Sequence, residues 1–360
     1  MSDRQGLVTA PGTGSKSTEW TQFGRTKRVR DLRERVMSTP PAICMERASL
    51  FTETYANLES LPMVLRRAHA FANVLRRMSI YILNGELIVG NQASQPRSAP
   101  IFPEFGVEWV ERELVFGDPI SPSERAGDRF EVPKGAVEVF QEVAEYWRGR
   151  THYDRVMVTL PEDTRTAWQM ETINHEWRMA GGDAHLVVDY PQVLREGLGG
   201  IIAAAEERLR SLRLSDPRDL EKRPFLQAVI VANRAVVDFA RRYAREAEIL
   251  AAVEDDPDRK RELAAVTDRC RRVPEHPAQT FAEALQSLWL VHVALQIEDN
   301  GHSLSLGRMD QYLYPYYATD VAAGRLTPED ALELLELFWV KLCEVNKFRS
   351  WPQSEFYLGY

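Results

Sequence analysis

Hydrophobic residues recur at spacings of three and four along most of the chain, and this period predicts a mostly helical protein. The clearest stripe lies in residues 63–78 and consists of Val64, Leu65, Ala68, Phe71, Ala72, Leu75 and Met78. Other helices are expected over residues 134–147, 191–214, 217–251 and 257–272. In the last three ranges a proline stands at the first position, where its missing N–H costs nothing.

Two later helices carry explicit start signals. Thr280 and Glu283 form a capping-box pattern before a strongly amphipathic helix that is expected to end near Glu298. The sequence TPED from Thr327 caps a second helix that runs to about Val345. Because neither an internal repeat nor a flexible linker interrupts the pattern, we expect one mostly helical unit with a few strands.

Short strands are predicted where β-branched residues gather over only a few positions. We expect strands over residues 86–90 and 156–160, and a strand or an extended loop over residues 184–190. Polar, proline-containing stretches between the elements are expected to be loops, at residues 91–105 and 121–133.

Composition narrows the class of protein. A chain of 360 residues with 44% hydrophobic and 27% charged residues is ordinary for a soluble globular protein. Its net charge of −8 argues against general nucleic-acid binding, and the basic residues between 25 and 35 are interleaved with acids, as on a solvated helix face. No apolar run approaches the ~20 residues that span a bilayer.

The cysteines and the N-terminus indicate a cytoplasmic setting. Cys44, Cys270 and Cys343 are odd in number and far apart, which argues against a disulfide framework or a zinc site. Residues 1–20 are expected to be a disordered tail without the apolar core of a secretory signal, and residues 21–360 to form the folded part.

The densest chemistry lies in residues 298–312, EDNGHSLSLGRMDQY, directly after the helix that ends near Glu298. Carboxylates, hydroxyls, an imidazole and a guanidinium gather there between glycines. His302 and Ser303 are the leading candidates for substrate binding, since a neutral imidazole and a hydroxyl both form hydrogen bonds. The structural alternative is that His302 only caps backbone groups at the end of the helix.

Several motifs, taken in order, resemble the N-terminal half of the glycyl radical enzymes related to pyruvate formate-lyase, most closely the glycerol and propanediol dehydratases. The resemblance runs over residues 25–360, and it rests on the order and spacing of its pieces rather than on one diagnostic motif. Those pieces are RASLFTE from Arg47, LRRA from Leu65, GELIVGN from Gly85, PIFPE from Pro100, EYWRG from Glu145, HLVVDY from His185, TFAEALQ from Thr280 with the segment 298–312, YPYY from Tyr314 and WVKL from Trp339.

The resemblance implies a helix-rich α/β fold, namely the N-terminal part of a ten-stranded α/β barrel built from two antiparallel half-barrels. Family members carry a catalytic cysteine in Gly-Cys-x-Glu and a radical glycine near the C-terminus. Neither motif occurs in this sequence, and the three cysteines stand in other contexts. We therefore expect a truncated reading frame or a fragment that is inactive by itself and prone to aggregation, because an incomplete barrel exposes strand edges. A soluble monomer that melts cooperatively would count against this.

Site roles are carried over from the family by position. His302 and Ser303 would hold vicinal hydroxyls, His185 would protonate the departing hydroxide, and Tyr360 would close the pocket with its ring and hydroxyl. The alternatives are a buried histidine satisfied by a backbone carbonyl for His185 and a core aromatic for Tyr360. Asp189 either orients His185 or caps the following helix, and we favour the cap.

Other polar residues are assigned structural roles. Arg308 and Asp310 are expected to form a buried or half-buried pair that fixes the loop, and His292 to be a satisfied core histidine. Arg178 would contact an anionic substrate in some family members, although a structural arginine is the favoured interpretation. Trp177 departs from the small polar residue of a glycerol dehydratase.

The implied function is radical dehydration of a small diol to an aldehyde. An iron–sulfur activating enzyme that uses S-adenosylmethionine would install the glycyl radical, and the cysteine thiyl would then abstract hydrogen from the substrate. The resemblance further implies a polar small-molecule substrate, a homodimer, and neither a nucleic-acid nor a membrane partner. No cofactor or metal is expected in this chain, because His185, His302 and Asp189 lack a further close ligand.

Two alternatives remain open. The first keeps the fold and changes the bond that is cleaved, to C–N, C–S or C–C, as in the choline, isethionate and aryl-acetate branches. The second is a non-catalytic helical scaffold derived from the same fold.

Overall fold

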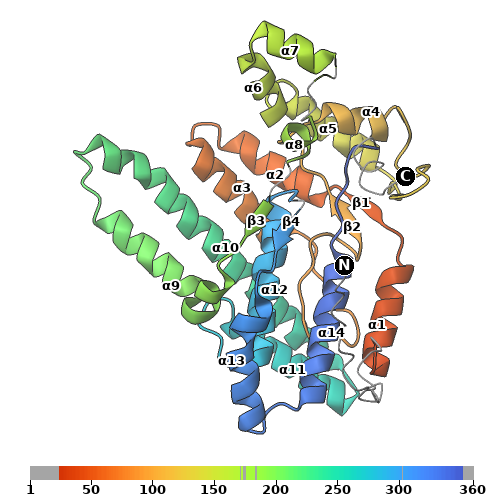
Figure 1. Ribbon diagram of the computed structural model, residues 1–360, viewed down its shortest axis with the longest axis vertical. Coiled ribbons are helices and arrows are strands. Elements are labelled where there is room, and N and C mark those ends of the chain that lie inside the picture. The colour runs from red at the N-terminus through yellow and green to blue at the C-terminus, as the bar shows by residue number, and fades with distance from the viewer. Residues whose placement is uncertain (1–23, 171, 173–175, 183–184, 302, 352–360) are drawn as a thin grey trace, which may run out of the picture.

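The computed structural model describes residues 24–170, 172, 176–182, 185–301 and 303–351, and helices dominate it (Figure 1). The expected tail at residues 1–20 lies outside these ranges. The helices are α1 (Lys27–Ser38), α2 (Glu46–Asn57), α3 (Met63–Arg77), α4 (Glu108–Leu114), α5 (Ala136–Trp147), α6 (His152–Thr159), α7 (Glu162–Gln169), α8 (Glu176–Gly181), α9 (Tyr190–Arg210), α10 (Pro217–Val253), α11 (Pro257–Arg272), α12 (Phe281–Glu298), α13 (Met309–Ala322) and α14 (Pro328–Glu344).

Four short strands form two separate parallel pairs within the described ranges. The strands are β1 (Ala42–Cys44), β2 (Ser98–Pro100), β3 (His185–Val187) and β4 (Ser303–Ser305). β1 pairs with β2, and β3 pairs with β4. None of the described helices is both long and apolar enough to cross a lipid bilayer.

Helix α12 runs through the middle of the molecule, with α13, α14 and α11 around its lower half (Figure 1). The expected amphipathic pattern is wrong for this helix, because nearly its whole circumference is buried. The sequence LWLVHVAL from Leu288 leaves no polar face, which is typical of a helix enclosed by other helices. Thr280 does cap it by accepting from the Glu283 N–H, whereas the Glu283 carboxylate accepts from Gln279 rather than closing the box on Thr280.

Residues 86–90 do not form the predicted strand. Their backbone groups instead bond to side chains of α12: Gln286 accepts from Val89 N at 3.0 Å and donates to Val89 O at 2.7 Å, and Trp289 Nε1 donates to Gly90 O at 3.0 Å. Gly90 has φ 141°, and a Cβ there would lie 2.7 Å from Trp289 Nε1, so this close approach requires glycine. The backbone groups of this apolar run are thus hydrogen-bonded to side chains of α12 rather than to a neighbouring strand.

Residues 156–159 belong to helix α6 instead of a strand, and Leu160 is its C-cap. Thr151 accepts from Asp154 N at 3.0 Å while the Asp154 carboxylate accepts from Thr151 N at 3.0 Å, a complete capping box. Val158 is 81% exposed, so no face of a strand would be buried here. The capping signal outweighs the strand propensity of Val156 and Val158 because propensity without burial is weak.

Beneath the loop 81–91, a buried lysine is held between two buried carboxylates. Lys341 Nζ lies 2.8 Å from Glu86 Oε1 and 2.9 Å from Glu344 Oε2, and Tyr81 donates to Glu344 Oε2 at 3.0 Å. Burial alone would lower the pKa of Lys341, but Glu344 and Glu86 raise it. Burial raises the pKa of Glu344 from 4.5 to about 7, against the opposing charge of Lys341.

This shift predicts that Glu344→Gln stabilises the protein above neutral pH. The folded pKa lies above the unfolded value, so the native state holds a proton that the unfolded state loses, and stability falls as the pH rises from about 4.5 to about 7. E344Q removes this fall, and we expect its unfolding free energy to exceed that of the wild type by about 2–3 kcal/mol at pH 8 and to match it at about pH 4, below both pKa values. Urea unfolding across pH measures both.

Glu53→Gln is the matched control, because Glu53 forms an exposed pair with Arg77. Its unfolding free energy should follow the pH profile of the wild type. Parallel profiles for E344Q and the wild type would show that Glu344 does not titrate in this window.

Candidate functional site

Strands β3 and β4 bring two of the predicted site residues together. Their parallel register sets His185 opposite Ser303, Leu186 opposite Leu304 and Val187 opposite Ser305. Partners in register lie on the same face of the pair, so the side chains of His185 and Ser303 share a face. Both residues are exposed. The predicted residues His302 and Tyr360 lie outside the described part of the chain.

The backbone before β3 is anchored to the segment that precedes β4 and to helix α4. Asn300 Nδ2 donates to Gly181 O at 2.7 Å, and Trp109 Nε1 donates to Ala180 O at 3.2 Å. After β3, the Asp189 carboxylate accepts from Gln192 N at 3.0 Å as the N-cap of α9, which confirms the predicted cap. Asp189 therefore fixes where β3 ends and α9 begins.

Tyr190 connects the β3 side of the site to α12. Its hydroxyl lies 2.9 Å from His292 Nδ1, and both side chains are buried. His292 Nε2 in turn lies 3.2 Å from Gln296 Nε2. Burial, followed by the charge of Lys347, lowers the pKa of His292 to about 4, so the ring is neutral at physiological pH. The predicted core histidine is confirmed, and it serves as the partner of Tyr190.

Replacing Tyr190 with phenylalanine tests this connection. The change deletes the hydroxyl and leaves His292 Nδ1 buried without that partner, so we expect a loss of about 1–3 kcal/mol in the free energy of unfolding. Tyr316→Phe is the control, because Tyr316 is only partly buried and its hydroxyl makes a longer contact of 3.4 Å to Leu194 O. Equal losses in the two variants, measured by urea unfolding, would contradict a special role for the Tyr190 hydroxyl.

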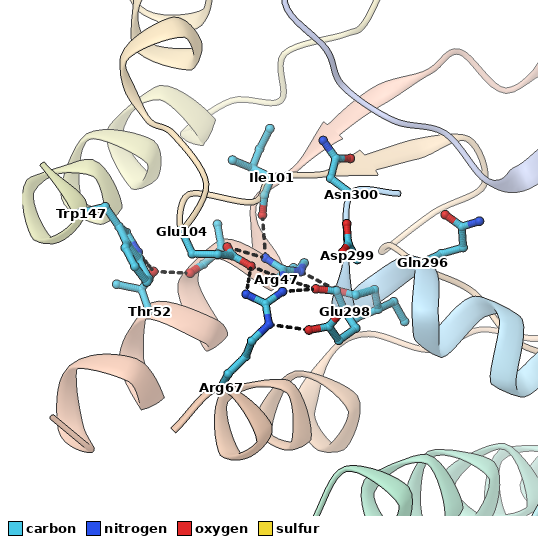
Figure 2. Close-up of polar contacts among 12 residues, drawn as sticks. Arg47, Thr52, Arg67, Ile101, Glu104, Trp147, Gln296, Glu298, Asp299 and Asn300 are labelled. Atoms are coloured by element: carbon cyan, nitrogen blue, oxygen red, sulfur yellow. Dashed lines mark hydrogen bonds and ion pairs between the residues drawn. The ribbon is translucent and has the colours of Figure 1, made fainter. Parts of the chain in front are cut away.

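The end of α12 is capped by arginines from two other helices (Figure 2). Arg47 of α2 donates through Nε to Ile297 O at 2.6 Å and through Nη2 to Glu298 O at 3.2 Å. Arg67 of α3 donates to Glu298 O at 2.9 Å. The last carbonyls of a helix have no partner within it and carry partial negative charge, so cationic donors are favourable there.

The segment after α14 supplies two more cations to the same backbone. Lys347 Nζ donates to Gln296 O at 2.8 Å and to Asp299 O at 3.0 Å. Arg349 Nη2 donates to Asn300 O at 3.2 Å. We call Arg47, Arg67, Lys347 and Arg349 the cationic collar, because together they bond every backbone carbonyl from residue 296 to residue 300.

Carboxylates balance the collar. Glu104 forms a two-pronged pair with Arg47, at 3.1 Å from Nη1 and 2.6 Å from Nη2, and both side chains are buried. Glu298 lies 2.5 Å from Arg67 Nε. Burial and the neighbouring charge of Glu298 raise the pKa of Asp299 from 3.8 to about 6, while Arg67, Lys347 and Arg47 lower it. Figure 2 shows Arg47, Arg67, Glu104, Glu298 and Asp299 gathered around the end of α12.

Sequence reasoning missed the collar. Arg47 and Arg67 lie in the motifs RASLFTE and LRRA, which were used only as evidence of the family resemblance. Lys347 and Arg349 lie in none of the motifs named above. An arginine next to the apolar face of a predicted helix is a usable sequence signal, because an arginine that becomes buried there needs a partner. The sequence does not indicate which carbonyls they bond.

Arg308 and Asp310 form the predicted ion pair, but its predicted burial is wrong. Their side chains are 75% and 63% exposed, and two contacts of 3.1 Å join them. The pair lies at the start of α13, where the chain has left the core. Trp177 and Arg178 belong to α8, and their side chains lie outside what the structure describes.

None of the three cysteines belongs to β3 or β4. Cys44 is in β1, Cys270 in α11 and Cys343 in α14. Burial raises the pKa of Cys270 to about 12, which leaves it an unreactive thiol. Among the residues that the structure describes, no cluster of three or more histidine, cysteine or carboxylate side chains could hold a metal ion.

The family model described as pyruvate formate lyase-like matches residues 19–360. The chain belongs to this family of glycyl radical enzymes. It is 41% identical over 316 residues to the probable dehydratase YbiW of Escherichia coli, covering 88% of this chain and 38% of that protein. It is 36% identical over 355 residues to the isethionate sulfite-lyase of Nitratidesulfovibrio vulgaris, covering 94% and 42%.

A solved structure of the glycerol-bound glycerol dehydratase from Clostridium butyricum superposes with a TM-score of 0.88 at 36% identity, covering 93% of this chain and 42% of that one. The helix-rich architecture therefore corresponds to part of the glycyl radical enzyme fold, as predicted. The chain spans about two fifths of the length of these relatives.

Proposed function

We propose that this chain forms one wall of the substrate pocket in a glycyl radical dehydratase that converts a small diol, of the glycerol or 1,2-propanediol type, to an aldehyde. The observation that carries the proposal is the parallel pairing of His185 with Ser303 on one exposed face. In this proposal the intact enzyme also contains a thiyl cysteine and a glycyl radical, installed by an iron–sulfur activating enzyme, and these supply the hydrogen abstraction.

The residues of this face suit a hydroxylated, uncharged substrate. The imidazole of His185 and the hydroxyl of Ser303 each donate and accept hydrogen bonds, as two neighbouring hydroxyl groups require. His185 would deliver the proton that turns the departing hydroxyl into water, and Ser303 would hold the hydroxyl that remains. His302 and Tyr360 are proposed to complete the pocket, His302 as a second proton-transfer group and Tyr360 as a hydrogen-bonding wall.

A second candidate is cleavage of a C–S bond, which the likeness to an isethionate sulfite-lyase favours. Recognition of a sulfonate calls for cationic donors. β3 and β4 carry no lysine or arginine in their six residues, which supports the diol over the sulfonate. The remaining alternative is a non-catalytic scaffold that never carries a radical.

Anaerobic activation of the intact enzyme separates these functions. We expect a glycyl radical signal in electron paramagnetic resonance, followed by aldehyde formation from glycerol or 1,2-propanediol. Sulfite release from isethionate without aldehyde formation from either diol would favour the second candidate. Activated samples that give no radical signal would overturn both enzymatic proposals in favour of the scaffold.

A further inference from the structure

The cationic collar draws its members from distant parts of the chain. Arg47 and Arg67 come from α2 and α3, while Lys347 and Arg349 come from the segment that follows α14. All four bond carbonyls within residues 296–300, directly before β4. The placement of Ser303 therefore depends on contacts that β4 itself does not make.

Lys347 bonds two carbonyls on either side of the end of α12. One ammonium group bridges Gln296 O, in the last turn of α12, and Asp299 O, after that helix has ended. It also lies 5.0 Å from the centre of the Phe102 ring, which shields it on another side. A single donor group thus fixes the direction in which the backbone leaves α12.

The same backbone holds the β3 side of the site. Asn300 follows Asp299 and donates from its side chain to Gly181 O at 2.7 Å, shortly before β3. A shift of residues 299–300 would therefore move both strands, and with them the register of His185 opposite Ser303.

We infer that Lys347 is a positioning residue for the candidate site: by bridging Gln296 O and Asp299 O it sets the exit of α12, and so the placement of Ser303 against His185. This inference rests on the proposed function for its effect on turnover, but not for its effect on the strands. Lys347 bonds backbone carbonyls, so it would act on the site through the placement of β3 and β4.

Lys347→Met tests the inference in the intact enzyme, with Lys222→Met as the matched control. Lys222 also makes a charged hydrogen bond, to Asp219 at 3.0 Å near the start of α10, remote from α12. Hydrogen exchange of the peptides that contain β3 and β4 should be about tenfold faster in K347M than in the wild type, because two charge-assisted bonds are lost, and unchanged in K222M. Wild-type exchange of both strands in K347M would overturn the inference.

Turnover provides the second measurement. With rates expressed per glycyl radical, we expect K347M to lower kcat/KM for the diol by about tenfold to a hundredfold, since small displacements of site groups are costly, and K347R to recover part of the loss. A purely structural role would lower the melting temperature or the radical content and leave kcat and KM per radical unchanged, which would also overturn the inference.

The two readouts keep the proposals distinguishable. Faster exchange in K347M, in an enzyme that turns over no diol, would support the positioning role and contradict the proposed substrate. Should K347M fail to fold, K347Q keeps an uncharged N–H donor group on a shorter side chain and should give an intermediate increase in exchange. Wild-type exchange in K347Q would then contradict the inference.

Discussion

Replacing His185 with glutamine in the intact enzyme is expected to lower kcat per glycyl radical by about 10²–10⁴-fold, the range for loss of a general acid. Glutamine retains a hydrogen-bonding amide, so diol binding should weaken less than turnover. The radical itself should still form, because its installation does not use His185 in the proposed mechanism. Aldehyde production normalised to the radical signal is the measurement.

The control for this experiment is His152→Gln. His152 is an exposed histidine at the first position of α6, away from β3 and β4. We expect wild-type turnover from H152Q. If H185Q also turned over within about twofold of the wild type, His185 would not be the proton donor. The alternative of a buried histidine is already wrong, because His185 is exposed.

Replacing Arg47 with methionine is expected to cost about 3 kcal/mol in the free energy of unfolding. The change removes the two-pronged pair with Glu104 and the bond to Ile297 O. Among the described residues, the buried Glu104 carboxylate then keeps a longer, 3.7 Å contact to Arg67. The guanidinium also stacks 3.8 Å from the centre of the Phe102 ring, and a thioether replaces that contact only partly. Urea unfolding measures the loss.

Two variants show whether the loss comes from the stranded carboxylate. R47M/E104Q removes both charges, so its unfolding free energy should lie closer to the wild type than that of R47M alone. Arg77→Met, which removes an exposed pair with Glu53, should cost less than about 1 kcal/mol. If R47M also lost less than about 1 kcal/mol, breaking the buried Arg47–Glu104 pair would cost no more than breaking an exposed pair.

Helices were predictable where a local signal and a burial pattern agreed. The ranges opened by Pro217 and Pro257 match α10 and α11, and Thr327 forms the capping box of α14. The predicted strands at 86–90 and 156–160 were wrong because local β propensity says nothing about available partners. In the first range, the side chains of Gln286 and Trp289 bond the backbone in place of a neighbouring strand. In the second, a capping box starts a helix, and no residue of that helix is buried.

Some features of the candidate site could be predicted from the sequence, and others could not. The sequence indicated His185 and Ser303 through the motifs around them, and it anticipated the Asp189 cap and the core role of His292. The parallel register of β3 with β4 could not be predicted, because it joins segments far apart in the chain. The burial of the Arg308–Asp310 pair was also misjudged, since sequence neighbours do not reveal where the chain leaves the core.

The sequence by itself determined the helical periodicity, the helix starts and the membership in the glycyl radical enzyme family, because each is written in local residue order. Only the tertiary structure decided how the end of α12 is held. Its carbonyls need donors that the helix cannot supply, and those donors arrive from α2, α3 and the segment after α14. Which cation meets which carbonyl depends on how distant elements pack, and the placement of Ser303 against His185 follows from that packing.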